Sequence, residues 1–383
     1  MKKMLVTILV VLMMPVIAYA QGTYSISELH EMYDGQRWQG EYYTARNETI
    51  TVDAPFLIPD VDAAPVLLVS PYPNLDPSFV STLTTNKYQD TRAEVARTQP
   101  LGYFSWMHRY EFTVAPDDMT MFTYNPVCYL PEEMSADVVA ENNPLNMMEA
   151  YDRVLGFYDE ILNTYGIGPV KLVPRMAEVI GFYRQKDGKP LSDHCGYHFE
   201  MLQALRGIPI LYSTNGIYPS SYKTQYKWEM WMDCPSAYCH MSSPDCFLLG
   251  GHFVQESEEL YADIPLTDFS QCQEKLVSMI EAGLVRQVRK IHLAYSLYAE
   301  SSHDTNKTYR LIAVPTWIVD CEYYPSKDNE QIKVHAEANY YHNSDNGFNY
   351  LMFNAQTGEY LDLKNTSKTR SDAPKIITWK KAK

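Results

Sequence analysis

The sequence predicts an α+β protein in which antiparallel sheets are each packed with a helix, following an N-terminal α/β segment. Twice along the 383 residues, an amphipathic helical pattern is followed by strands of alternating polarity. Each stretch also contains a turn of the hairpin type, Asp187-Gly188 in the first and Thr357-Gly358 in the second. The composition, 46% apolar and 21% charged, is that of a globular protein. We therefore expect two helix-plus-sheet units, with two unrelated α+β stretches as the alternative.

Residues 1–20 have the pattern of a secretory signal peptide. Two lysines precede an apolar run over 5–16, and Ala18-Tyr19-Ala20 forms a small-x-small cleavage site. The alternative is a membrane anchor, but Pro15 interrupts the run, which is shorter than the roughly 20 residues that span a bilayer. No cysteine follows the cleavage site to carry a lipid. We expect an exported protein, periplasmic or secreted, with no transmembrane segment in the mature chain.

Residues 21–135 are predicted to form an N-terminal α+β region. The pattern indicates helices at 25–33, 77–83 and 90–97, and strands at 49–54, 66–69, 110–114 and 119–124. The acidic, Asn-rich stretch 132–143 is typical of a linker.

Residues 136–260 are predicted to form the first helix-plus-sheet unit. Asn143-Pro144 reads as a cap with proline at the first helical position. The helix is expected to end near Gly166, and the strand 179–183 to enter the Asp187-Gly188 hairpin. One apolar stripe of this helix is formed by Met148, Tyr151, Leu155, Tyr158 and Leu162.

Residues 261–363 are predicted to form the second unit. Asp268, with Gln271 three positions later, indicates a helix start, and Gly283 its end. The buried face of this helix is expected to carry Phe269, Cys272, Leu276 and Met279. Strands are predicted at 290–298, 309–324, 332–341 and 350–363. The remaining residues, 364–383, form a basic tail with seven Lys or Arg and one acid.

Export implies that the cysteines encounter an oxidising compartment, where disulfides are the default. The chain has seven, Cys128, Cys195, Cys234, Cys239, Cys246, Cys272 and Cys321. The odd number leaves at least one thiol. Because three of them fall between Cys234 and Cys246, we expect a loop closed by a local disulfide, and the sequence assigns no specific pairing.

Motifs for common chemistry are absent from the sequence. It contains no Gly-rich phosphate loop, no Gly-x-Ser-x-Gly and no His-Glu-x-x-His. The net charge of −15 argues against nucleic acid as a partner.

The best metal candidate is the segment from Asp193 to His198. His194 and His198 could face one ion if the segment were helical, and Cys195 could add a thiolate. Gly196 disfavours a helix and no third ligand follows at a recognisable spacing, so we predict no metal.

Cys234-x4-Cys239-His240 has two intervening residues too many for covalent haem, and a Cys239–His240 nucleophile has no further support. We predict no cofactor.

The chain has 31 Tyr, some of them in adjacent pairs: Tyr42-Tyr43, Tyr323-Tyr324 and Tyr340-Tyr341. Neighbours in a strand point to opposite faces, so one Tyr of each pair can pack inward while the other is exposed. Exposed Tyr could bind glycan or peptide, although cross-strand pairing within the sheet explains them more simply.

Two C-terminal segments resemble PepSY-like domains. Leu311–Val319 carries Pro315-Thr-Trp317, and Tyr350–Glu359 carries Asn354-Ala-Gln-Thr-Gly358. The same pattern occurs in exported regulators of the YycH/YycI kind. Residues 50–62 are similar to the start of uncharacterised exported lipoprotein-type proteins of gut bacteria, although this chain lacks their lipid-bearing cysteine.

The resemblance implies a role in protein–protein regulation in the envelope, including restraint of proteases, and transfers no catalytic residue. It also implies that Trp317 anchors the sheet to the helix and that Gly358 supplies a tight turn. We therefore expect an exported, non-enzymatic protein that binds an envelope protein or peptide. The alternative is a metal-dependent hydrolase around His194 and His198.

Overall fold

The computed structural model describes residues 22–71, 91–95, 104–108, 119–122, 128–129, 131–140, 143–164, 170–184, 196–213, 236–243, 246–299, 311–324 and 349–361. The signal peptide 1–20, the tail 364–383, the helix 77–83, the strands 110–114 and 332–341 and the Asp187-Gly188 turn lie outside these residues.

The protein is α+β and mostly sheet, and the described residues include three α-helices. The helices are α1 (Ile26–Tyr33), α3 (Met147–Thr164) and α4 (Ser270–Glu281), with a short 3-10 turn, η2 (Pro131–Glu133). The strands are β1 (Thr23–Tyr24), β2 (Arg37–Tyr43), β3 (Thr49–Leu57), β4 (Val66–Pro71), β5 (Thr91–Val95), β6 (Phe104–His108), β7 (Met119–Phe122), β8 (Cys128–Tyr129), β9 (Lys171–Arg184), β10 (Gly196–Leu205), β11 (Ile208–Ser213), β12 (Ser236–Ser243), β13 (Cys246–His252), β14 (Val254–Tyr261), β15 (Leu266–Thr267), β16 (Val285–Ala299), β17 (Leu311–Tyr323) and β18 (Asn349–Asn354). No described helix is both long and apolar enough to cross a membrane.

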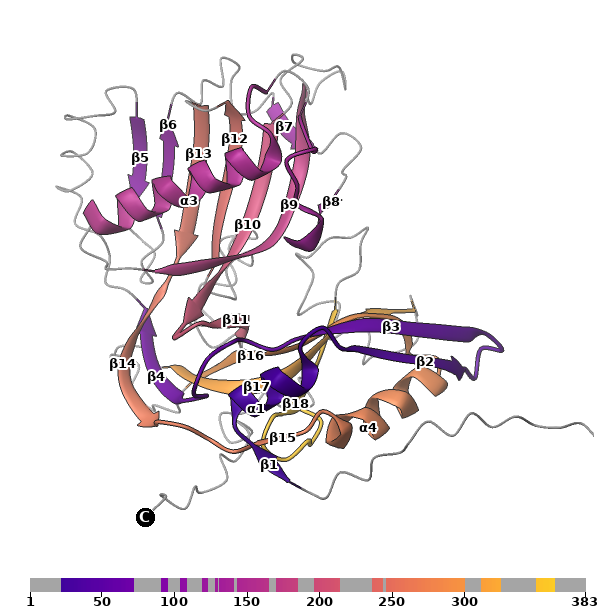
Figure 1. Ribbon diagram of the computed structural model, residues 1–383. Helices are drawn as coiled ribbons and strands as arrows, with labels where there is room; N and C mark the ends of the chain where they lie inside the picture. The colour runs from indigo at the N-terminus through magenta and orange to yellow at the C-terminus, as the bar shows by residue number, and fades with distance from the viewer. Residues whose placement is uncertain are drawn as a thin grey trace, which may run out of the picture.

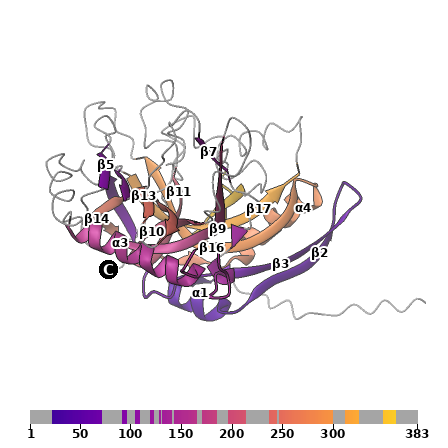
Figure 2. The same ribbon diagram turned by 90° about the horizontal axis from the view of Figure 1, so that it is seen from above.

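Among the described residues, one curled sheet of 16 strands runs through two lobes. Its main path has the order β14-β4-β17-β16-β11-β10-β12-β13-β6-β5, and β2, β3, β7, β8, β9 and β18 pair beside this path. In the α3 lobe, helix α3 lies across β13, β12, β10 and β9; in the α4 lobe, β16, β17 and β18 lie with α1 and α4 (Figures 1 and 2). The sheet passes between lobes where β11 pairs antiparallel with β10 and parallel with β16. The β10–β11 turn uses Gly207 at φ +86°, a conformation that glycine adopts without strain.

Strands of the N-terminal region enter both lobes. β4 pairs with β14 and β17 of the α4 lobe, whereas β6 pairs with β13 and β8 with β9 of the α3 lobe. Long-range pairings of this kind leave no trace in local sequence patterns.

Helix α3 buries Tyr151, Tyr158 and Leu162 as predicted, but Met148 and Leu155 of the predicted stripe are only partly buried, and the helix begins later than predicted. The first helical residue is Met147, not Pro144, because the Asn146 side chain accepts from the Glu149 N–H and Glu149 accepts from the Asn146 N–H, both at 3.0 Å. This reciprocal pair is a capping box that fixes the start. Met147, Ala150, Tyr151, Val154, Tyr158 and Leu162 are buried in the α3 lobe core.

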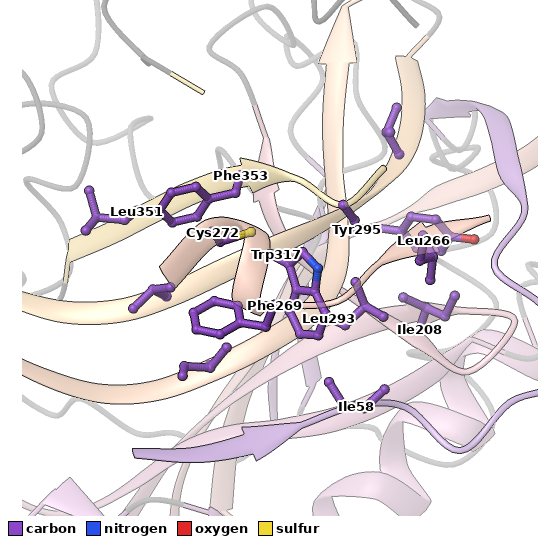
Figure 3. Packing of buried hydrophobic residues seen from close by; sticks show 14 of the residues in the cluster. Ile58, Ile208, Leu266, Phe269, Cys272, Leu293, Tyr295, Trp317, Leu351 and Phe353 are labelled. Carbon is purple, nitrogen blue, oxygen red and sulfur yellow. The ribbon is translucent and has the colours of Figure 1, made fainter. Parts of the chain in front are cut away.

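The α4 lobe is organised around Trp317, as expected from the sequence. Trp317 is fully buried, packs edge-on to Phe269 at 5.4 Å between ring centroids, and donates from Nε1 to the Thr267 carbonyl at 3.1 Å. Phe269, Cys272, Leu276 and Met279 are all buried, which confirms the predicted face of α4. Figure 3 shows Phe269 and Cys272 beside Trp317 in this core.

The helix predicted at 90–97 is wrong, because residues 91–95 form β5, which pairs antiparallel with β6. The sheet edge supplied by β6 overrides a short and ambiguous local pattern.

The linker predicted at 132–143 includes buried Ala140 and Asn143, so it is packed against the α3 lobe. Buried Tyr197 fixes it by accepting from the Ala140 N–H at 2.7 Å and donating to the Leu145 carbonyl at 2.9 Å.

Candidate functional site

His198 lies in strand β10, and His194 and Cys195 lie outside the described residues. The chain is extended from Gly196 onward, so the helical arrangement needed for a His194–His198 pair does not hold in the part that carries His198. In a strand, positions four apart are separated by about 13 Å.

His198 belongs to a buried cluster with Glu178 and Glu200. His198 Nε2 is 3.5 Å from Glu200 Oε1, and Glu178 on β9 is the register partner of His198. Glu178 and His198 are only 8% and 5% exposed. Burial raises the pKa of Glu178; nearby His198 lowers it, and Glu200 raises it.

Two further polar residues occupy the positions paired with His198 and Glu178 on the neighbouring strands. His240 on β12 is the register partner of His198, and Cys128 on β8 is the partner of Glu178. Among the side chains that the structure describes, no three His, Cys, Asp or Glu are arranged to hold a metal ion.

A second polar cluster lies where the two lobes face each other. Lys290, Asp320 and Tyr350 are register partners on β16, β17 and β18. Arg175 on β9 donates from Nη2 to the Tyr350 hydroxyl at 2.8 Å, and the Lys290 ammonium lies 2.9 Å from the Glu132 carboxylate of η2. These two contacts join the lobes, and we refer to the five residues as the inter-lobe cluster.

Burial is the main cause of the pKa shifts of Asp320 and of the neighbouring His292. It raises the pKa of Asp320 to about 7, although Arg289, Arg175 and Lys290 lower it. Asp320 is 7% exposed, and its Oδ1 accepts no hydrogen bond from the described residues. The neighbouring His292 has its pKa lowered to about 3, by burial and by Lys290 and Arg175. Asp320 can therefore exchange a proton near neutral pH, whereas His292 stays neutral there.

Sequence reasoning missed the inter-lobe cluster, because its members are scattered from η2 to β18. The available signal was Asp320 directly after the apolar run of β17 and Lys290 directly before that of β16, because charged side chains are seldom fully buried without a partner.

Strand β2 forms an open edge of the sheet within the described part of the chain, where it pairs with β3 alone. At its two ends, the Phe56 N–H donates to the Gln36 carbonyl at 3.1 Å and the Thr44 N–H donates to the Glu48 carbonyl at 2.8 Å. Hydrogen-bonded positions alternate along an antiparallel strand. The even-numbered residues of β2 therefore bond to β3, and Arg37, Gln39, Glu41 and Tyr43 direct their backbone groups outward.

The Tyr42-Tyr43 pair divides as the sequence predicts. Tyr42 is half-buried, with its ring centroid 5.7 Å from that of Trp38, whereas Tyr43 is 65% exposed at the end of the open edge. Tyr324 is half-buried, and the Arg46 guanidinium lies over its ring, 4.4 Å from the ring centroid. The side chain of Tyr323 and the pair Tyr340-Tyr341 are outside the described residues.

The described cysteines are buried thiols. Cys239 lies within the β12–β13 hairpin, fully buried, and burial raises its pKa. Cys272 is likewise a free, buried thiol with a raised pKa. A buried, high-pKa Cys239 fits neither haem attachment nor a nucleophile, and it takes no part in a local disulfide. Cys195 and Cys234 lie outside the described residues, as do the side chains of Cys128 and Cys246.

Comparisons with known proteins show the fold alone. Neither a protein-family model nor a curated protein matches this sequence. The chain is similar to the crystal structure of an uncharacterized protein from Eubacterium rectale ATCC 33656, with a TM-score of 0.51 and 13% sequence identity. The match covers 88% of this chain and 96% of that chain.

Proposed function

We propose that the chain is an exported, non-enzymatic binding or regulatory protein of the bacterial envelope, which acts through protein or peptide contacts. In this proposal the two helix-on-sheet lobes are PepSY-like units. The observation that carries it is the open edge of β2, with exposed Tyr43 at its end.

An open strand edge is a template for an extended peptide. Outward N–H and C=O groups of Arg37, Gln39 and Glu41 would bond to an added strand, and Tyr43 would supply apolar contact area. The net charge of −15 disfavours an acidic segment, so the expected partner is a neutral or basic extended peptide.

Proline at an outward position tests this proposal. Gln39→Pro removes an outward N–H, and proline is tolerated at an edge because no ladder bond is lost. We expect that in vivo cross-linking in an exporting host captures an envelope protein with the unaltered chain and with the control Gln39→Thr. A folded Gln39→Pro variant should lose this product.

Retention of the same cross-linked partner by Gln39→Pro would contradict the use of this edge. A concentration-dependent dimer, seen by sedimentation and abolished by Gln39→Pro, would instead identify the edge as a self-association surface and reject the peptide proposal.

The metal-dependent hydrolase around His194 and His198 is the second proposal. It is favoured by one observation: the buried Glu178 is the register partner of the buried His198, and His240 is the register partner of His198 on its other side. The test is transition-metal content of protein purified without chelators. Near-stoichiometric metal that His198→Ala abolishes would support a metal site, and metal-free folded protein would reject it.

A further inference from the structure

A small cavity lies between the two segments that carry the PepSY-like resemblance. It is bordered by the Pro315-Thr316 part of β17, by Asn354 and Gln356 of the turn after β18, and by Tyr298 of β16. Val314 and Leu361 complete its apolar wall. The cavity therefore joins three segments that are far apart in the sequence.

Two buried polar atoms at this cavity make no hydrogen bond of acceptable distance and angle with the described residues: the Tyr298 hydroxyl and Gln356 Nε2. The Ser296 and Thr316 hydroxyls lie close enough to the Tyr298 hydroxyl to lower its pKa, but neither meets it in the geometry of a hydrogen bond. Two polar neighbours direct hydrogen bonds elsewhere. The Thr316 hydroxyl donates to the Val314 carbonyl at 3.0 Å, and the Asn354 side-chain oxygen accepts from the Gln356 N–H at 2.9 Å. A buried polar group left unsatisfied is costly, so both atoms call for a partner.

The cavity has room for one small partner. Its volume is about 10 Å³, which is close to the minimum that accommodates a water molecule. The missing partner must accept a hydrogen bond from the Gln356 amide, because Nε2 is only a donor. It must also bond to the Tyr298 hydroxyl, which can donate or accept. No charged side chain lines the cavity, so a neutral molecule fits better than an ion.

We propose that this cavity binds one ordered water molecule, which accepts from Gln356 Nε2 and hydrogen-bonds to the Tyr298 hydroxyl. The water links β16 to the Asn354–Gly358 turn beside Thr316 of β17. Gln356 thereby has a defined role within the Asn-Ala-Gln-Thr-Gly motif, where its side chain holds the bridging water. The inference is independent of the proposed peptide-binding edge.

A double-mutant cycle tests the shared water. Tyr298→Phe and Gln356→Met each remove one polar partner with little change of volume. We expect each single change to lower the folding equilibrium constant about five- to tenfold, measured by urea unfolding. The double variant should lose little more than either single variant, because both remove bonds to the same molecule.

Tyr324→Phe provides the matched control, since it removes a hydroxyl that bonds to Glu48 at a different place. Combined with Gln356→Met, its effect should be additive. A crystal structure should show one water peak within hydrogen-bonding distance of both atoms. An empty cavity, a larger bound molecule, additive losses in the Tyr298–Gln356 cycle, or a neutral Tyr298→Phe variant would each overturn the proposal.

Discussion

Arg175 in the α3 lobe donates a 2.8 Å hydrogen bond to the hydroxyl of Tyr350 in the α4 lobe. The two residues come from β9 and β18, and Tyr350 is only 5% exposed. The bond joins the polar part of the interface to an apolar part formed by Leu202, Leu211, Ala294, Ile318 and Met352. The contact between lobes is therefore both apolar and specifically hydrogen-bonded.

Tyr350→Phe should weaken this contact without removing the ring. A hydrogen bond to a charged donor contributes about 1.5–3 kcal/mol, so we expect the free energy of unfolding to fall by about this amount. Urea unfolding measures the loss. The control Tyr43→Phe removes an exposed hydroxyl that bonds to Asn47 and should change stability little. Equal stability of Tyr350→Phe and the unaltered protein would contradict an energetic role for the bond.

Asp320 should make the protein less stable as the pH rises. Its pKa is raised to about 7 in the folded state, against about 3.9 in an unfolded chain. The unfolded chain therefore ionises first, and stability falls as the pH rises from about 4 to about 7. Asp320→Asn should remove this dependence and raise the free energy of unfolding at pH 8 by an amount on the order of a few kcal/mol. The substitution does not leave the neighbouring Arg289 and Lys290 without a carboxylate, because they still pair with Glu322 and Glu132.

Urea unfolding of Asp320→Asn and the unaltered protein at pH 5 and pH 8 checks this expectation. The stability difference between the two proteins should be larger at pH 8. A difference that is equal at both values would show that Asp320 does not titrate in this range.

His292 should act in the opposite direction. Its pKa is lowered to about 3, against about 6.5 in an unfolded chain. The unfolded chain therefore binds a proton first as the pH falls, and stability is lost between about pH 6.5 and pH 3. Because this window overlaps that of Asp320, the two slopes partly cancel in the unaltered protein. We expect His292→Gln to steepen the gain in stability on acidification from pH 7 to pH 5, measured by thermal unfolding. An unchanged slope would contradict this assignment.

The sequence predicts well where local pattern decides the structure. The helix over 25–33 and the buried face of α4 follow from the spacing of their apolar residues. Trp317 is buried and Gly358 has a positive φ, in line with the positions that the PepSY-like resemblance gives them. Residues 91–95 illustrate the opposite case, because a short segment takes its structure from its neighbour β6.

The candidate sites depend on contacts that no local pattern reveals. His198 was identified from its neighbour His194, whereas the structure places it beside Glu178 on another strand. Arg175 and Tyr350 are 175 positions apart. The register of the sheet brings such residues together, and register is set by packing of whole strands.

Gly358 and Gly156 should respond in opposite ways to alanine. Gly358 has φ +70°, and an added Cβ would lie 2.6 Å from the Gln271 Cβ and 3.2 Å from the Gln271 backbone carbon. Gly358→Ala therefore combines backbone strain with a collision against α4, and we expect a loss of at least about 1 kcal/mol. Gly156 lies exposed within α3, and an added Cβ would meet nothing within 4 Å. Gly156→Ala should gain about 0.5–1 kcal/mol, because alanine favours the helix.

Thermal or urea unfolding of the two variants, each compared with the unaltered protein, gives both signs in one experiment. Destabilisation by Gly358→Ala together with stabilisation by Gly156→Ala would support the turn geometry after β18 and the register of α3. If Gly358→Ala were neutral, the turn would have to differ from the left-handed conformation described, and the packing of Gln271 against it would be wrong. If Gly156→Ala were strongly destabilising, that position of α3 would have to be covered by another part of the chain, because open space around a helical glycine leaves alanine only its higher helix propensity.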